Sequence, residues 1–201
     1  MNHDVLFGEV VNKLPFNGTT RRVTLYGSLV LLIASLVSYP AHALTESVSL
    51  DQFLHGVDDQ CRYGDSLRKF WENLLSVDTN GKPKLTARVA SEYVPIEIRQ
   101  SMGEAAFSEK NVEYFAINVP ITGTWRGLHV EALKFIIGNE NGWHSLAVIF
   151  QSPPQQVKKI FGPFVVKSQR KMKADKNNEI EASIQFVAEN KKIMLVCDDS
   201  T

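Results

Sequence analysis

The sequence has no excess of charge of either sign, because its 201 residues include 22 Lys and Arg against 22 Asp and Glu. Proteins that bind nucleic acid or an anionic membrane through their overall charge are strongly basic, so this balance argues against both kinds of partner. Apolar residues make up 44% of the chain and charged residues 22%, which is the composition of a globular protein and not of a disordered one. We therefore expect a single folded domain.

Recognisable catalytic and cofactor motifs are also missing. The sequence contains no glycine-rich phosphate loop, dinucleotide-binding fingerprint or nucleophile elbow, and no metalloprotease pair of histidines around a glutamate. Three histidines follow residue 43, namely His55, His129 and His144, which leaves few groups for acid and base catalysis near neutral pH. We therefore expect no catalytic residue and no cofactor.

His129 and Glu131 would share one face of a predicted strand, and both are residue types that bind zinc. The only further histidine nearby is His144 on the next strand, and the expected pairing places it near Asn139. Asn139 lies eight residues from Glu131, or roughly 26 Å along a strand. The sequence therefore predicts no metal site.

Long apolar runs are scarce, and the one present lies near the start of the chain. Residues 25–39 carry no charge, follow two arginines and precede Ala41 and Ala43. A basic flank, an apolar stretch and small residues before a cleavage point are typical of a secretory signal. As a helix this run would span about 22 Å, less than the ~30 Å hydrocarbon core of a bilayer. The sequence therefore predicts a signal peptide over residues 1–43 with a long n-region, cleaved after Ala43. An uncleaved membrane anchor is the alternative.

Cysteine is almost absent. Cys61 and Cys197 are the only two, and they lie near the two ends of the predicted exported domain, residues 44–201. Export delivers both to an oxidising compartment, and a redox pair would normally lie two residues apart. The sequence therefore predicts a disulfide that closes a loop of 137 residues, with two free thiols as the alternative.

Two apolar stripes at helical spacing follow the cleavage point. The first begins with a capping-box pattern at Ser49 and Gln52 and predicts a helix over residues 49–61. The second predicts a further helix, or a continuation of the first. A polar loop over residues 78–84 and a short helix after Pro95 that ends at Gly103 complete this half. The two stripes consist of Leu50, Phe53, Leu54, Val57 and Cys61, then Leu67, Phe70, Trp71, Leu74 and Leu75.

From residue 112 the apolar period changes from 3.6 to 2. Alternation over residues 115–121 predicts a strand with one buried face, and a turn at residues 125–127 leads to a second strand over residues 128–138. The Asn141-Gly142 pair predicts a type I′ hairpin into a third strand, with Ile137 opposite Leu146.

The last third of the chain starts with a capping-box pattern at Ser152, Pro153 and Gln155. It predicts a helix ended by Gly162 and Pro163. A short strand at residues 164–167, a lysine-rich connection over residues 168–178 and strands at residues 180–188 and 192–197 follow. The predicted fold class is α+β: an N-terminal helix or helix pair packed on an antiparallel sheet of about five strands, in the order α-β-β-β-α-β-β.

Two groups of residues are candidates for binding. Trp125, Arg126 and Trp143 fall at strand ends or turns, where recognition residues often lie. Residues 158–176 contain seven positive side chains against one negative, and we select Lys171 and Lys173 from them as a candidate patch for an acidic partner. An ordinary solvated surface is the alternative for this patch.

These observations predict an exported protein, periplasmic or secreted, that acts as a non-enzymatic binding or inhibitor module, of which an immunity protein is one kind. The expected partner is another envelope or secreted protein. Nucleic acid is not expected as a partner, and neither is stable membrane insertion after cleavage. The alternative is a small cell-envelope hydrolase whose active site carries no recognisable motif.

Overall fold

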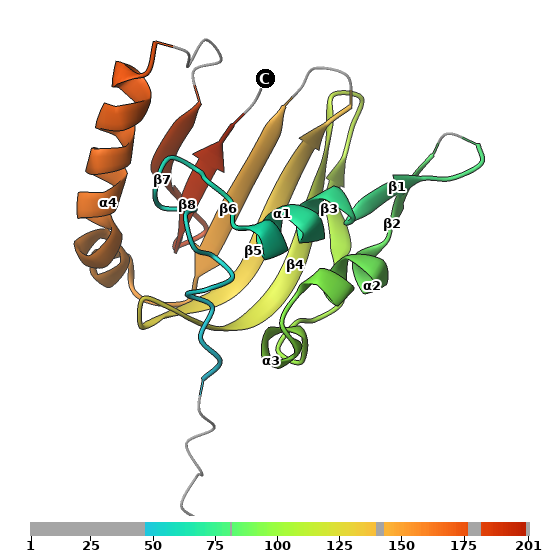
Figure 1. The fold of residues 1–201 in the computed structure, drawn as a ribbon, viewed down its shortest axis with the longest axis horizontal. Coiled ribbons are helices and arrows are strands. Elements are labelled where there is room, and N and C mark those ends of the chain that lie inside the picture. Colours follow the sequence, from blue (N-terminus) through green and yellow to red (C-terminus); the bar gives the residue numbers. More distant parts are fainter. Residues whose placement is uncertain (1–46, 81, 140–142, 177–181, 200–201) are drawn as a thin grey trace, which may run out of the picture. The chain divides into compact units, whose positions relative to one another are not determined.

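The structure is a computed structural model that describes residues 47–80, 82–139, 143–176 and 182–199. These residues belong to one compact unit, Ala43–Thr201. The unit combines helices with an antiparallel sheet, so the predicted α+β class is confirmed. The number and order of the elements differ from the prediction. Figure 1 shows the sheet with α4 beside one edge and the shorter helices towards the other.

The main sheet has six strands, one more than expected. Their order is β3-β4-β5-β6-β8-β7, and every neighbouring pair is antiparallel. The strands predicted from the alternating pattern are confirmed as β4, β5, β6, β7 and β8, and β3 is additional. Their bounds are β3 (Ala106–Lys110), β4 (Tyr114–Trp125), β5 (Leu128–Gly138), β6 (His144–Phe150), β7 (Ser183–Glu189) and β8 (Lys192–Asp198).

The register between β5 and β6 differs from the expected one by two residues. Ile137 pairs with His144 and not with Leu146, which pairs with Phe135. Side chains alternate between faces with a period of two, so a shift of two leaves the same side chains on the same face. Phe135 and Leu146 are accordingly both buried. The expected turn centre at residues 141 and 142 lies outside the described residues.

The first apolar stripe is buried as predicted, but the helix expected over residues 49–61 is wrong. This segment is a series of turns, with positive φ at Gly56 (87°), Gln60 (61°) and Cys61 (56°). A Cβ at Gly56 would lie 2.0 Å from the carbonyl oxygen of Arg62, so only glycine fits there. The Leu50 N–H donates to the carbonyl oxygen of Thr124 (2.7 Å), which attaches the segment to the end of β4.

The second stripe forms α1 (Asp65–Glu72), as predicted, with Leu67 and Phe70 buried. Phe70 packs against Phe53 and Phe135, with ring centroids 6.1 and 5.8 Å apart. The loop expected over residues 78–84 is shorter, because its flanks pair as β1 (Leu75–Val77) and β2 (Pro83–Leu85). Three short helical pieces follow: α2 (Ala87–Ala90), the 3-10 helix η1 (Ser91–Tyr93) and α3 (Ile96–Arg99). The helix expected after Pro95 is therefore present but ends at Arg99.

The last helix, α4 (Pro154–Ala174), runs straight through the expected stop at Gly162 and Pro163. The strand expected at residues 164–167 and most of the lysine-rich connection are helical instead. Ser152 does not cap the helix, since its Oγ accepts a hydrogen bond from the His129 N–H (2.8 Å). The buried stripe continues at helical spacing past the proline, and its burial holds both halves in one helix. It consists of Val157, Phe161, Val165, Ser168 and Met172.

Helices α1 and α4 cover the same face of the sheet. Phe70 of α1 packs on Phe135, and Phe161 of α4 packs on Phe150 at 5.3 Å between ring centroids. The pairing of β5 with β6 turns Phe135 and Phe150 to one side. The core therefore lies between this face and the two helices.

The predicted disulfide between Cys61 and Cys197 is confirmed, with a Cα–Cα distance of 5.5 Å. It joins the irregular N-terminal segment, and not a helix, to β8. No helix in the described part of the chain is long and apolar enough to span a bilayer.

Candidate functional site

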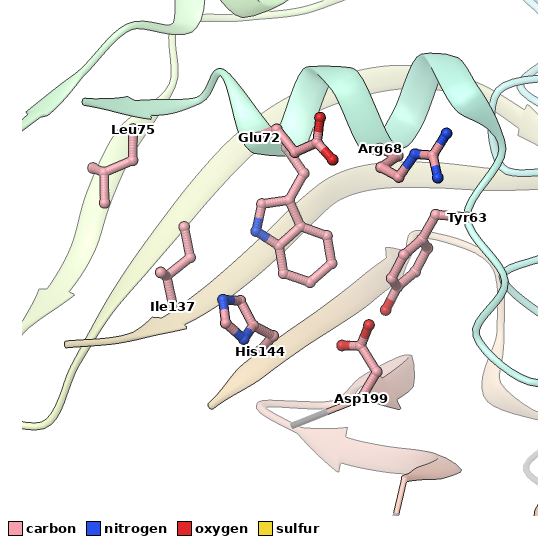
Figure 2. A pocket seen from close by; sticks show the side chains of 8 residues that line it. Tyr63, Arg68, Glu72, Leu75, Ile137, His144 and Asp199 are labelled. Atoms are coloured by element: carbon pink, nitrogen blue, oxygen red, sulfur yellow. The ribbon is translucent and has the colours of Figure 1, made fainter. Parts of the chain in front are cut away.

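A hollow of about 420 Å³ lies beneath α1, beside the ends of β5, β6 and β8. Figure 2 shows Arg68 and Glu72 on α1, with Ile137, His144 and Asp199 on the strand side of this region. The walls combine aromatic and aliphatic surface with both signs of charge. The lining residues are Tyr63, Arg68, Trp71, Glu72, Leu75, Ile137, His144 and Asp199.

The disulfide lies close to two of the polar residues of this hollow. Tyr63 follows Cys61 by two positions, and Asp199 follows Cys197 by two. The Asp199 N–H also donates to the carbonyl oxygen of His144 (3.1 Å), which continues the pairing of β8 with β6. The bridge therefore holds Tyr63 and Asp199 near one another although they are far apart in the sequence.

Trp71 is at the centre of an aromatic cluster. Its ring centroid lies 5.2 Å from that of Tyr63, 5.2 Å from that of Phe135 and 6.1 Å from that of His144. The ring is half-buried, so it belongs both to the edge of the core and to the wall of the hollow. The sequence pattern identified only the core role.

Two buried polar atoms in this region, Tyr63 Oη and Asp199 Oδ1, have no hydrogen bond of good geometry among the described residues, although the two side chains interact with each other. Figure 2 shows the Tyr63 hydroxyl pointing towards the Asp199 carboxylate. A buried polar group without a partner costs about 1–3 kcal/mol of stability. Such a cost beside a cavity is typical of a site kept for a function and not for stability.

Burial changes the proton affinity of both groups. It raises the pKa of Asp199 to about 6, although a charge on the neighbouring His144 acts in the opposite direction. Burial, and then the Asp199 carboxylate, raise the pKa of Tyr63 above its ordinary value of 10.0. Asp199 can therefore gain or lose a proton near neutral pH, which an ordinary aspartate cannot do.

The exposed rim of the hollow carries two further charges from α1. The Arg68 guanidinium forms an ion pair with Asp65 at 2.6 Å, and both side chains are well exposed. Glu72, one turn further along α1, is also exposed, and Figure 2 shows it on the same side of the helix as Arg68.

Of the predicted binding residues, Trp125 lies inside the core. Its side chain is 1% exposed, and its ring centroid is 4.4 Å from that of Phe161 and 6.1 Å from that of Phe150. The expectation that this ring lies at the surface is corrected, because the turn after β4 folds the ring under α4.

Arg126 connects three parts of the molecule. Its N–H donates to Asp51 Oδ1 (2.6 Å), its Nε donates to Asp58 Oδ2 (2.7 Å), and its guanidinium lies 4.1 Å from the centroid of the Phe164 ring. These contacts give Arg126 a structural role that its position in a turn did not reveal.

The structure does not bring the remaining predicted residues together. Trp143 packs on Tyr114 at 5.1 Å between ring centroids, at the opposite end of β4 from Trp125. Lys171 and Lys173 lie on α4, where Lys171 forms an ion pair with Asp59 at 2.6 Å and Lys173 is exposed.

The outer face of α4 is strongly basic. The helix contains six cations and no Asp or Glu, and Lys171 is the one with an ion pair in the described part of the chain. At 100° per residue, Lys159 and Arg170 lie opposite the buried stripe. The exposed cations of the helix are Lys158, Lys159, Lys167, Arg170 and Lys173.

The zinc site rejected from the sequence has no counterpart within the described ranges, where no three His, Cys, Asp or Glu side chains gather closely enough to hold a metal ion. Glu131 instead forms an ion pair with Lys192. Comparisons with protein-family models, with curated proteins and with solved structures found no match for this chain.

Sequence reasoning did not identify Tyr63, Glu72 or Asp199 as site residues. A signal for two of them was present: Tyr63 and Asp199 are polar residues at equal distances after the two cysteines. A predicted disulfide brings such residues together. The position of Glu72 beside them depends on how α1 packs, which the sequence pattern does not specify.

Proposed function

We propose that the protein is exported and acts as a non-enzymatic binding module that recognises an acidic surface on another envelope or secreted protein. An inhibitor, for example an immunity protein, acts in this way. The observation that carries the proposal is helix α4, which has six cations, five of them exposed, and no acidic residue over its 21 residues.

The length of this helix and the apolar side chains between its cations support a contact with a partner surface. A helix of 21 residues is about 30 Å long, which is three Debye lengths at an ionic strength of 0.1 M. Val166 and Ile160 are 46% and 37% exposed among the cations, so a partner would also bury apolar surface there. Lys171 contributes least, since Asp59 already neutralises it.

The experiment is affinity capture from an envelope extract, followed by purification of a stoichiometric partner and a binding assay with the two pure proteins. Replacing Lys159 and Arg170 with glutamate should weaken binding at least tenfold at low salt, and less at high salt. The matched control replaces Lys82, just before β2, and Lys84, within β2, with glutamate. This control makes the same change in net charge. Equal weakening by both pairs, or by neither, would contradict a specific role for α4.

The export part of the proposal has its own test. Cleavage after Ala43 would give a mature chain that begins at Leu44. Mass spectrometry of the protein recovered from the envelope or the medium should find this mass. A chain that retains residue 30 contradicts cleavage at this site.

A second candidate function is a small cell-envelope hydrolase, and one observation favours it. Asp199, with a pKa of about 6, lies beside His144 in the hollow under α1, and this pair could relay a proton to or from a water molecule. Turnover of peptidoglycan or ester substrates that is lost in both Asp199→Asn and His144→Gln would support it. Unchanged turnover in these variants would point to a contaminating enzyme.

A further inference from the structure

The hollow under α1 combines aromatic surface with carboxylates, and the binding proposed for α4 does not use it. The rings of Tyr63 and Trp71 form one wall, and Leu75 and Ile137 continue its apolar part. Figure 2 shows the Glu72 carboxylate beside α1 and the Asp199 carboxylate next to the Tyr63 hydroxyl. A volume of about 420 Å³ is enough for a long side chain or a small molecule.

Two carboxylate side chains, Glu72 and Asp199, and two residues that can carry positive charge, Arg68 and His144, line this hollow. Arg68 forms its ion pair with Asp65 on the exposed side of α1. Within the described residues Glu72 has no ion pair, and Asp199 Oδ1 has no hydrogen-bond partner. His144 lies beside Asp199, and its charge favours the ionised form of the Asp199 carboxylate. With Arg68 paired to Asp65, the hollow therefore has two carboxylates against one imidazole, next to two aromatic rings.

We propose that this hollow binds an ammonium or guanidinium group carried on an apolar stem. A cation next to the faces of tryptophan and tyrosine rings is attracted by their negative electrostatic potential. It would also offset the buried charge of Asp199, which is costly when left unpaired. The stem would pack on Leu75 and Ile137.

Other ligand classes fit less well. An anion would be repelled by Glu72 and Asp199, and a neutral apolar molecule would exclude water from the Asp199 carboxylate without compensating its charge. The cationic group has two sources with the same chemistry: a free alkyl amine, or a lysine or arginine side chain of a partner protein.

The proposed binding depends on pH in a defined direction. Because burial raises the pKa of Asp199 to about 6, this carboxylate ionises between pH 5 and pH 7.5. Binding of a cation should therefore strengthen as the pH rises through this interval. The other charged or titratable groups that face Asp199 or the hollow are Arg68, Glu72, His144 and Asp198, and the Tyr63 phenol stays neutral.

The test uses the full chain with its disulfide intact and follows the NMR signals of the Trp71 indole N–H and the His144 ring during titration with n-butylammonium. n-Butanol provides the same stem without the charge, and butyrate provides the opposite charge. We expect n-butylammonium to bind about tenfold more tightly than n-butanol at pH 7.5, and more weakly at pH 5. Glu72→Gln and Asp199→Asn should each weaken it several-fold, whereas Glu97→Gln on α3 should not.

Amides of Nα-acetyl-lysine and Nα-acetyl-arginine distinguish the two sources. Binding of these amides as tight as that of n-butylammonium indicates a partner side chain, and binding of the free amine alone indicates a small molecule. The proposal is overturned if n-butanol binds as tightly as n-butylammonium, if butyrate binds more tightly, or if no probe shifts the two signals at up to about 100 mM, where ligands of this size still bind measurably. The result is independent of the α4 proposal, because no residue of α4 lines the hollow.

Discussion

Asp58, which is buried, and Asp199, which is half-buried, have different roles in this fold. Asp58 is 4% exposed, and its carboxylate accepts a hydrogen bond from Arg126 Nε at 2.7 Å. Asp199 is less buried, yet its Oδ1 has no partner within the described part of the chain. A paired buried charge is a structural element, whereas an unpaired one is a cost that a binding site can use.

The first prediction concerns the Arg126 side chain. Arg126→Ala should lower the free energy of unfolding by about 2–3 kcal/mol, because it leaves the Asp58 carboxylate buried without its partner. This figure is below the usual range for a buried pair because Arg126 itself is 39% exposed. Urea denaturation measures the change. Adding Asp58→Asn to Arg126→Ala should recover part of the loss, and a loss that stays the same in the double variant would contradict the ion-pair explanation.

The second prediction concerns Asp199 and pH. Its pKa in the folded protein, about 6, is above the ordinary 3.8, so folding favours the protonated carboxyl. The contribution of this group is most favourable below about pH 4 and is lost as the pH rises through 6. Asp199→Asn should therefore raise the free energy of unfolding by about 1–3 kcal/mol at pH 7.5 and change it little at pH 4. Glu97→Gln serves as the control, and an equal effect of Asp199→Asn at both pH values would count against a raised pKa.

At the scale of elements, helix α4 continues through Gly162 and Pro163, residues that locally favour its end. Burial of its side chains in the core outweighs that preference. A proline in a helix interior costs about 3 kcal/mol, because its ring clashes with the preceding turn and its nitrogen cannot donate. Fully burying a side chain such as Phe161, Val165 or Met172 contributes about 1.5–3 kcal/mol each. Val165 and Met172 follow Pro163, so ending the helix there would lose more free energy of burial than the proline costs.

The third prediction follows from this balance. Pro163 is exposed on α4, so Pro163→Ala should raise the free energy of unfolding by about 1–3 kcal/mol through a restored backbone hydrogen bond. Gly162→Ala, where an added Cβ meets no atom within 4 Å, should add about 0.5–1 kcal/mol. Thermal and urea denaturation check both variants. A less stable Pro163→Ala protein would show that the proline relieves strain at this point.

In the N-terminal segment, by contrast, a helical pattern of apolar residues occurs without a helix. Its apolar spacing is helical and its side chains are buried, but its backbone turns at Gly56 and again at Gln60 and Cys61. Residues with positive φ cannot continue an α-helix. Contacts with β4 and the bridge to β8 keep the segment in place instead.

At the scale of the whole molecule, the disulfide connects the two ends of the described chain. Cys61 and Cys197 are separated by 136 positions, and closing so long a loop in the unfolded state contributes about 4–5 kcal/mol in the chain-entropy model. The bridge also holds Tyr63 and Asp199, so it links stability with the geometry of the hollow.

The fourth prediction tests this link. Reduction, or the double replacement of Cys61 and Cys197 with serine, should lower the melting temperature by several degrees or more. The pKa of Asp199, followed by NMR, should move from about 6 towards 3.8 as its surroundings loosen. Denatured, unreduced protein should contain no reactive thiol. A melting temperature that does not change on reduction would show that the bridge adds nothing to stability.

Much of the fold follows from the sequence alone. Alternation with a period of two identifies β4, β5 and β8 because one face of each strand must be buried, and the two cysteines identify their own bond because no other partner exists. Burial of the first stripe also follows from its apolar side chains. These properties depend on residue type and local spacing, which a sequence contains directly.

Only the tertiary structure decided the rest. The stripe at residues 49–61 is turned and not helical, α4 passes its proline, and Trp125 is covered, because in each case contacts with distant elements outweigh a local preference. The hollow depends on the same kind of contact. Its tyrosine and glutamate come from one stretch of the chain and its aspartate from a stretch more than a hundred residues later, and only the packing of α1 and the bridge to β8 bring them around Trp71.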